Sequence, residues 1–528
     1  MSPSDMPSEL MTLIVSHLIT PSEIAPAGQL QTPDKVAIYA TVSKDWQKCI
    51  ERHTFSSILL TPARLDEFDQ IIRGPRRKYV RLIALDVVLD SYDEEACGRY
   101  ETEEDQQKNN RLFTRTLQRL FLTMSSWEGV WEGVREADLG IYMSVKVYSR
   151  SDLSRLSQDE GRARRALKNR IGGANDILDR RFDKSYLRLL DPENDGEASA
   201  LPHSVSAITG IDITARNLRH MCPASCSLIL FKLPGLRTFN SHLWDNERKD
   251  LDLRKRARHG RHSSRNIRFH GTLIFSCKDF ASSISLWPAS INKVDLQYYN
   301  VGPADETFMP PNILPSSSNQ DPLSSNLRAF SQQLTDLTLA DITIGAEFFW
   351  PSAASQTSGS LSPHWPHLTS LTINYTPITP SGQWLFERDP NDEEEEIEWG
   401  EDPALYTEED ELPAPQDQRV NPFRKKASPE LMNALYVAAG KAAGKMPVLR
   451  QMWLAASTGT RLSHSFQYTA TATSASVCWR STLLFEPSEE VLDVWKEAAR
   501  KNLEVDLEGK LVSYLHPTLQ TGHLNTCL

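Results

Sequence analysis

Two stretches decide the expected fold: LTDLTLADITI at residues 334–344 and LTSLTINYTPI at residues 368–378. They begin 34 residues apart, and both have apolar side chains at the first, fourth, sixth and eleventh positions. Apolar and polar residues alternate in the middle of each stretch, which predicts a strand with one buried face. The ninth position breaks the likeness, because Ile342 in the first stretch corresponds to Thr376 in the second. The pair therefore predicts an imperfect repeat.

The first three apolar positions recur as a triplet elsewhere in the chain. The further triplets are Phe55/Ile58/Leu60, Leu82/Leu85/Val87, Ile208/Ile211/Ile213, Leu236/Phe239/Ser241, Ile291/Val294/Leu296 and Leu449/Met452/Leu454. Roughly thirty such triplets arise by chance in a chain of this composition, so the flanking residues carry more weight than the number of matches. Four triplets follow a proline-marked turn, at Pro234, Pro288, Pro366 and Pro447.

This pattern predicts an α/β body over residues 56–528, built as an irregular leucine-rich-repeat-like solenoid with insertions. A helix over 488–501 is expected to cap its last strand. The alternative is a mixed α/β domain without a true repeat.

Strand alternation also predicts which residues face outward. The residue between the last two apolar positions of each triplet points away from the buried face, which gives the stripe Asp212, Asn240, Asp295, Thr338, Thr372 and Trp453. We expect Asp295, Thr338, Thr372 and Trp453 to face a substrate. The alternative for Trp453 is that the C-terminal helix covers it near Trp495.

The first 55 residues predict a separate helical module. Pro7 suits the first turn of a helix, and Leu10, Ile14 and Leu18 follow at helical spacing. A second apolar stripe, which includes Val42 and Trp46, predicts another helix.

These residues resemble the F-box. The matching positions are Pro7, Glu9, Leu10, Ile14, Leu18, Val42, Ser43, Lys44, Trp46 and Phe55, although the stretch between 18 and 36 is longer than usual. The resemblance implies that the module docks onto a Skp-type adaptor of a cullin-RING ubiquitin ligase. The residues expected to bind that adaptor are Pro7, Leu10, Ile14, Leu18, Val42 and Trp46.

Further landmarks look like those of a family of filamentous-fungal F-box proteins. They are Asn109-Asn110-Arg111, Phe348-Phe349-Trp350-Pro351, the stretch 384–390, Met446-Pro447 and Trp479. This resemblance implies architecture and no chemistry. Within it, Arg388 and Asp389 are expected to form a buried pair.

The net charge of −11 comes from one segment. Fifteen acidic residues and one basic residue lie between 387 and 417, which leaves the rest of the chain at +3. We expect a mobile acidic loop at about 390–420. The basic run at 254–261 predicts a solvated loop, with a nuclear signal or a nucleic-acid contact at 248–268 as the alternative.

Several classes of protein are not favoured. No apolar stretch approaches the length of a membrane span, and seven scattered cysteines indicate free thiols in the cytoplasm or nucleus. Cys222 and Cys226 lack a second ligand pair, and His259 and His262 are expected on the surface, so we expect no metal and no cofactor. No catalytic motif is present in the sequence.

The sequence thus favours a non-catalytic, substrate-recognition adaptor of a Skp/cullin/F-box type ubiquitin ligase, with an unknown protein as substrate. The alternatives are a scaffold whose F-box-like helices only pack against the body, and a nuclear protein associated with nucleic acid.

Overall fold

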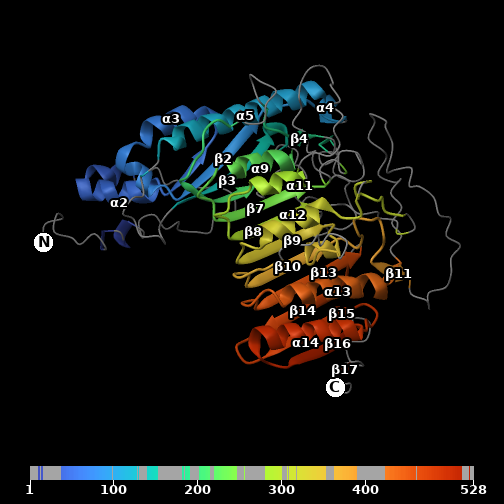
Figure 1. Cartoon of the computed structure of the whole chain (residues 1–528). Helices are drawn as coiled ribbons and strands as arrows, with labels where there is room; N and C mark the ends of the chain where they lie inside the picture. The colour runs from blue at the N-terminus through green and yellow to red at the C-terminus, as the bar shows by residue number, and fades with distance from the viewer. Residues whose placement is uncertain are drawn as a thin grey trace.

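The structure is a computed structural model that describes residues 10–11, 13–15, 37–97, 99–127, 129, 140–152, 181–182, 185–190, 201–213, 219–245, 255, 258, 280–299, 306, 309–316, 318–352, 362–388, 423–458, 461–513 and 522–523. Within these residues, one sheet of thirteen strands runs through the molecule (Figure 1). In spatial order its strands are β1 (Ser57–Leu60), β2 (Leu82–Leu89), β3 (Ile141–Ser149), β5 (Ile208–Ile213), β7 (Thr238–Trp244), β8 (Lys293–Tyr299), β9 (Asp336–Ile342), β10 (Ser370–Tyr375), β13 (Gln451–Thr458), β14 (Arg461–Ala470), β15 (Ala475–Ser481), β16 (Leu507–Ser513) and β17 (Gly522–His523).

Strand direction divides the sheet into two parts. From β1 to β13 every neighbouring pair is parallel, and the sheet then turns antiparallel at β13–β14 and β14–β15. The pair β15–β16 is parallel again, and β17 closes the edge antiparallel. Two short pairings lie outside the main sheet, β4 (Tyr186–Leu187) with β6 (His220–Met221) and β11 (Phe386–Arg388) with β12 (Arg424–Ala427).

The described helices of the body lie along one face of this sheet (Figure 1). They are α3 (Leu65–Ile71), α4 (Glu94–Cys97), α5 (Glu103–Ser125), α9 (Pro223–Phe231), α11 (Phe280–Ser283), α12 (Pro322–Ser331), α13 (Pro429–Ala443) and α14 (Glu489–Leu503). Side-chain caps fix where several begin, because Thr102, Asp321 and Ser488 each accept a hydrogen bond from the third residue after them.

The core fills the space between the helices and the sheet. Strand residues alternate between buried and half-buried, as in β2 and β3, so one side of each strand packs under the helices. Two Trp-Pro turns fasten this layer: the Trp287 indole donates to Ser227 Oγ of α9, and the Trp365 indole donates to Ser331 Oγ of α12, both at 2.8 Å. The opposite side of the sheet, which the described helices do not cover, is called the open face below.

The prediction of an irregular leucine-rich-repeat-like solenoid is wrong. The structure shows one continuous mixed sheet of α/β type, with antiparallel strands at its C-terminal end and no solenoid within the described residues. The triplets do lie in register, since Leu337 pairs with Leu371 and Leu371 with Met452. A triplet indicates only that one face of a strand is buried. It does not show the direction of the strand or whether the repeats have equal length, and this is the physical reason for the error.

The expected N-terminal helical F-box is not shown either. Of its second helix, the structure describes η2 (Ala37–Thr41) and α2 (Lys44–Thr54), and of its first only helical residues at 10–11 and 13–15. The long connection between the two lies outside the described residues.

Candidate functional site

Exposed apolar side chains gather near the N-terminus of the described chain. Leu10, Leu13, Ile38, Tyr39 and Val42 are exposed, and Ile38 shows 61% of its surface. We call these five residues the N-terminal patch. They surround a small cluster of their own, in which Val15 and Ile50 are buried. Because this cluster is separate from the main core, the patch is not the edge of a larger packed surface.

The structure places the residues expected to bind a Skp-type adaptor as follows. Leu10 and Val42 are exposed at 52% and 57%, whereas Ile14 and Trp46 are half-buried. Pro7 and Leu18 lie outside the described residues. Two of the six therefore belong to the N-terminal patch, and Trp46 packs against the small cluster beneath it.

Helix α2 is well defined and fixed to the body. Ser43 caps its start by accepting a hydrogen bond from Trp46 N at 3.2 Å. Near its end, Glu51 receives two hydrogen bonds from Arg76 in η4 (Gly74–Tyr79), at 2.7 and 3.2 Å. The bond to Arg76 lowers the pKa of Glu51, and the same guanidinium lies 5.2 Å from the centre of the Phe55 ring. This contact holds α2 in one orientation against the start of the sheet.

The open face carries the four residues expected to meet a substrate. Asp295 on β8 is paired with Thr338 on β9, Thr338 with Thr372 on β10, and Thr372 with Trp453 on β13. Asp295 is exposed and the other three are half-buried. They form one straight row across four neighbouring strands, which we call the open-face row. Asp212 and Asn240 continue the same line on β5 and β7.

A second group lies beside the row on the open face. The Asn240 amide donates to the Tyr142 hydroxyl at 3.0 Å, and the Tyr142 ring lies across Gly210, where an added Cβ would be 2.4 Å from a ring carbon. Burial, and then the charge of Asp212, raises the pKa of Tyr142. Gly210 is thus required by the close approach of the ring.

Neighbouring groups shift the pKa of Asp295 in both directions. Although Asp295 is exposed, partial desolvation by its neighbours raises its pKa, nearby His242 lowers it, and Asp212 raises it through like-charge repulsion. The adjacent Lys293 does not neutralise it, because Lys293 pairs with Asp336 at 3.3 Å. Asp212 and Asp295 place two carboxylates on one line at this end of the row, which makes it the acidic end.

Trp453 and Trp495 lie on opposite faces of the sheet. Trp495 packs on Phe466 and Tyr468 in the core, with ring centres 4.7 and 5.3 Å apart. Those residues pair with Leu454 and Met452, the buried neighbours of Trp453. Since neighbouring strand residues point to opposite faces, α14 does not cover Trp453. The alternative that placed the C-terminal helix over it is wrong.

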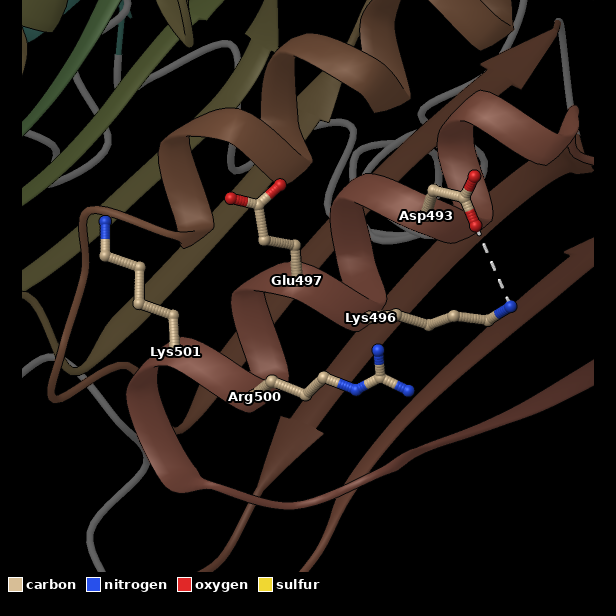
Figure 2. Close-up of a pocket in the computed structure, with 5 residues that line it drawn as sticks. All are labelled: Asp493, Lys496, Glu497, Arg500 and Lys501. Atoms are coloured by element: carbon tan, nitrogen blue, oxygen red, sulfur yellow. Dashed lines mark ion pairs between the residues drawn. The ribbon is translucent and has the colours of Figure 1, made fainter.

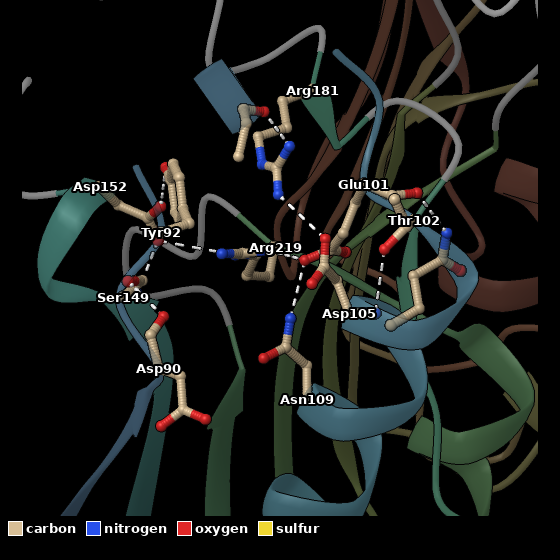
Figure 3. A network of polar contacts seen from close by, with 12 residues as sticks. Asp90, Tyr92, Glu101, Thr102, Asp105, Asn109, Ser149, Asp152, Arg181 and Arg219 are labelled. Atoms are coloured by element: carbon tan, nitrogen blue, oxygen red, sulfur yellow. Dashed lines mark hydrogen bonds and ion pairs between the residues drawn. The ribbon is translucent and has the colours of Figure 1, made fainter. Parts of the chain in front are cut away.

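A buried ionic network lies beyond the carboxyl ends of β2 and β3 (Figure 3). Arg219 donates to Glu101 at 2.5 Å and lies 3.5 Å from Asp152, while Arg181 lies 3.5 Å from Asp105. Neutral side chains also take part in the network. The Asn109 amide donates a hydrogen bond to the Glu101 carboxylate at 2.7 Å. Arg181, Arg219 and Asp152 are almost completely buried, and the charges pair with each other. The network ties together segments that are far apart in the sequence, such as those of Glu101 and Arg219.

The basic run at 254–261 is not simply a solvated loop. Arg258 is fully buried, where it lies 3.3 Å from Asp245 and donates to Asp321 at 2.7 Å and to the Thr343 carbonyl at 2.6 Å. Burial opposes its charge, but the two carboxylates raise the pKa of Arg258 above its usual value. At least one cation of the run is therefore structural, which weakens its use as a phosphate-binding patch.

Both cysteines of the close pair are buried in the packed body. Cys222 and Cys226 are buried at the start of α9, and burial raises the pKa of the Cys226 thiol to about 12. Among the described residues, no three His, Cys, Asp or Glu side chains are grouped as a metal site requires. His259 and His262 lie outside those residues.

A shallow depression on α14 offers little chemistry (Figure 2). Asp493, Lys496, Glu497, Arg500 and Lys501 line it. Asp493 and Lys496 lie 3.8 Å apart on successive turns of the helix. Charges of both signs on one exposed helix face are typical of a solvated surface.

Sequence reasoning missed Tyr142 and the buried network. Alternation along residues 141–149 could have placed Tyr142, Lys146 and Tyr148 on the open face, but this stretch lacks the triplet. The expected Arg388–Asp389 pair cannot be followed, because Asp389 lies outside the described residues, as does the acidic segment at 390–420. Arg388 itself lies 5.5 Å from the centre of the Phe423 ring.

One family of proteins is similar to the C-terminal part of the chain. The sequence pattern of a family described as "Family of unknown function (DUF6546)" matches residues 420–521. That range contains β12, α13, β13 to β15, α14 and β16. A search of curated proteins gives no match. Among the described residues, no helix has both the length and the apolar character of a membrane span.

Proposed function

We propose that the chain is the substrate-recognition adaptor of a Skp/cullin/F-box type ubiquitin ligase. The N-terminal helices bind a Skp-type adaptor, the open face binds a protein substrate, and other subunits transfer ubiquitin. One observation carries the proposal: the N-terminal patch exposes five large apolar side chains in the segment whose sequence resembles the F-box.

Exposure of this patch favours a partner over a purely structural role. Fully burying a large apolar side chain contributes roughly 1.5–3 kcal/mol. Helices that served only to support the body would bury Leu10, Ile38 and Val42 against it, and the structure leaves these three more than half exposed. Large exposed apolar side chains on two segments that share one small cluster are typical of an interaction site.

The alternative that the protein associates with nucleic acid has less support. It depended on the basic run, in which Arg258 is buried and paired with Asp245 and Asp321. The open-face row has an acidic end, which repels phosphate groups.

Capture by a purified Skp-type adaptor tests the proposal. Leu10→Glu should abolish capture, because it places a charge at the centre of the expected interface, and the body should keep its melting temperature. Val448→Glu is the matched control, since Val448 is exposed at 44% in the turn before β13, far along the chain from the patch. Loss of fold throughout the Leu10→Glu chain, or capture equal to that of the control, would contradict the proposal.

A further inference from the structure

The side chains of the open-face row change from charged to apolar along the row. Along the open-face row, a carboxylate on β8 is followed by hydroxyl groups on β9 and β10 and by an indole on β13. The described helices lie on the other face (Figure 1). From this order we infer that the open face binds an extended segment of a substrate protein that has a basic residue followed, about four residues later, by a large apolar residue. This inference rests on the proposed function, since the segment is the substrate's.

The spacing follows from the geometry of the sheet. Neighbouring strands lie about 4.8 Å apart, so Asp295 and Trp453, three strands apart, are separated by about 14 Å. An extended chain advances about 3.3 Å per residue, and a segment that crosses the strands covers this distance in about four residues.

The chemistry at each end selects the side chain. At this end of the row a second carboxylate, Asp212, lies on the same line two strands from Asp295, and Lys293 is paired with Asp336 at 3.3 Å. A lysine or arginine there gains a charge-assisted hydrogen bond. At the other end, Trp453 is half-buried on an open strand face, and tryptophan is enriched among the residues that dominate protein interfaces.

The middle of the row suits a backbone. Thr338 and Thr372 are half-buried hydroxyls without charge, and they can donate to and accept from peptide groups. A nucleic acid would bring phosphates against Asp295 and Asp212, and an anionic membrane would do the same. A basic and apolar peptide is therefore the partner that matches the whole row.

A synthetic peptide tests the inference without any other subunit. The probe has nine residues, with lysine at its third position, phenylalanine at its seventh and serine elsewhere, and carries a fluorescent label for anisotropy. The charge control has glutamate in place of lysine. The spacing control has the same composition, with phenylalanine moved to the fourth position.

We expect the probe to bind the full chain at least about tenfold more tightly than either control peptide does. Asp295→Asn and Trp453→Ala should each weaken binding of the probe several-fold or more, and Trp453→Phe should retain most of it. Glu508→Gln is the matched protein control, because Glu508 is an exposed acid on β16 of the same face and lies away from the row. It should bind the probe as the unchanged chain does.

Failure of this inference can be told apart from failure of the proposed function. Leu10→Glu should bind the peptide normally even though it loses the Skp-type adaptor. Equal binding of the probe and the two control peptides would overturn the inference, and so would unchanged binding by Trp453→Ala with its fold intact. Displacement of the probe by a single-stranded oligonucleotide would overturn it as well.

Discussion

Two buried histidines make the stability of this protein depend on pH. His464 is completely buried, with its Nε2 atom 2.6 Å from the Tyr436 hydroxyl and its ring near those of Phe386 and Phe485. Burial lowers the pKa of His464 to about 3. His220 is buried between Tyr186 and Trp244, and burial together with the charge of Arg219 lowers its pKa to about 3.

The direction of the effect follows from these values. Both histidines are neutral in the folded chain, whereas in the unfolded chain each binds a proton below its ordinary pKa of 6.5. The stabilising contribution is therefore fully present above pH 6.5 and is lost progressively as the pH falls from 6.5 towards 3. At pH 5 the loss is about 2 kcal/mol for each histidine and about 4 kcal/mol for both.

Urea denaturation at pH 7.5 and pH 5 measures this loss. His464→Gln removes one titrating group, so its free energy of unfolding should fall by about 2 kcal/mol less than that of the unchanged chain over the same interval. His367→Gln, at an exposed position, controls for the removal of a histidine that is not buried. If the unchanged chain and His464→Gln lost stability in parallel between the two pH values, the reasoning would be refuted.

Two further substitutions test other parts of the core. Arg258→Met should lower the free energy of unfolding by about 3–5 kcal/mol, because it leaves Asp245 and Asp321 buried without their cation; a loss under about 1 kcal/mol in chemical denaturation would show that the network is not needed. Gly210→Ala should cost about 1–3 kcal/mol, because the new Cβ meets the Tyr142 ring at 2.4 Å. Adding Tyr142→Ala should recover part of that cost, and a double-mutant cycle with simple additivity would contradict the clash.

Sequence patterns predicted the elements whose burial is local. Strands β9 and β10 follow from alternation, and the stripe from Asp295 to Trp453 follows from it as well, because side chains alternate between faces whatever the strand pairs with. Strand direction does not follow. The triplet of β13 does not show that β14 pairs with it in the antiparallel direction. The prediction of a solenoid was wrong for this reason.

The buried charges were unpredictable for a different reason. Arg258 stands in a run that looks like a solvated basic loop, yet its partner Asp321 is 63 positions away in the sequence. The network around Arg219 and Glu101 spans 118 positions. Local sequence shows the charge of such residues, while only the tertiary structure shows that they are paired and buried.

The order of strands in the main sheet has a consequence for how the chain is made. From β1 to β17, each strand lies beside the one that precedes it in the sheet-forming sequence. During synthesis from the N-terminus, the strand beside which each new strand pairs has therefore already been translated. Each pairing joins two successive strands of the main sheet. A chain that stops after one of the inner strands leaves that longer strand as an unpaired edge, which invites pairing with another molecule. Among the described strands, two short ones stand at the edges of the sheet: β1 lies along β2 at Leu82–Leu85, and β17 lies along β16 at Lys510 and Leu511.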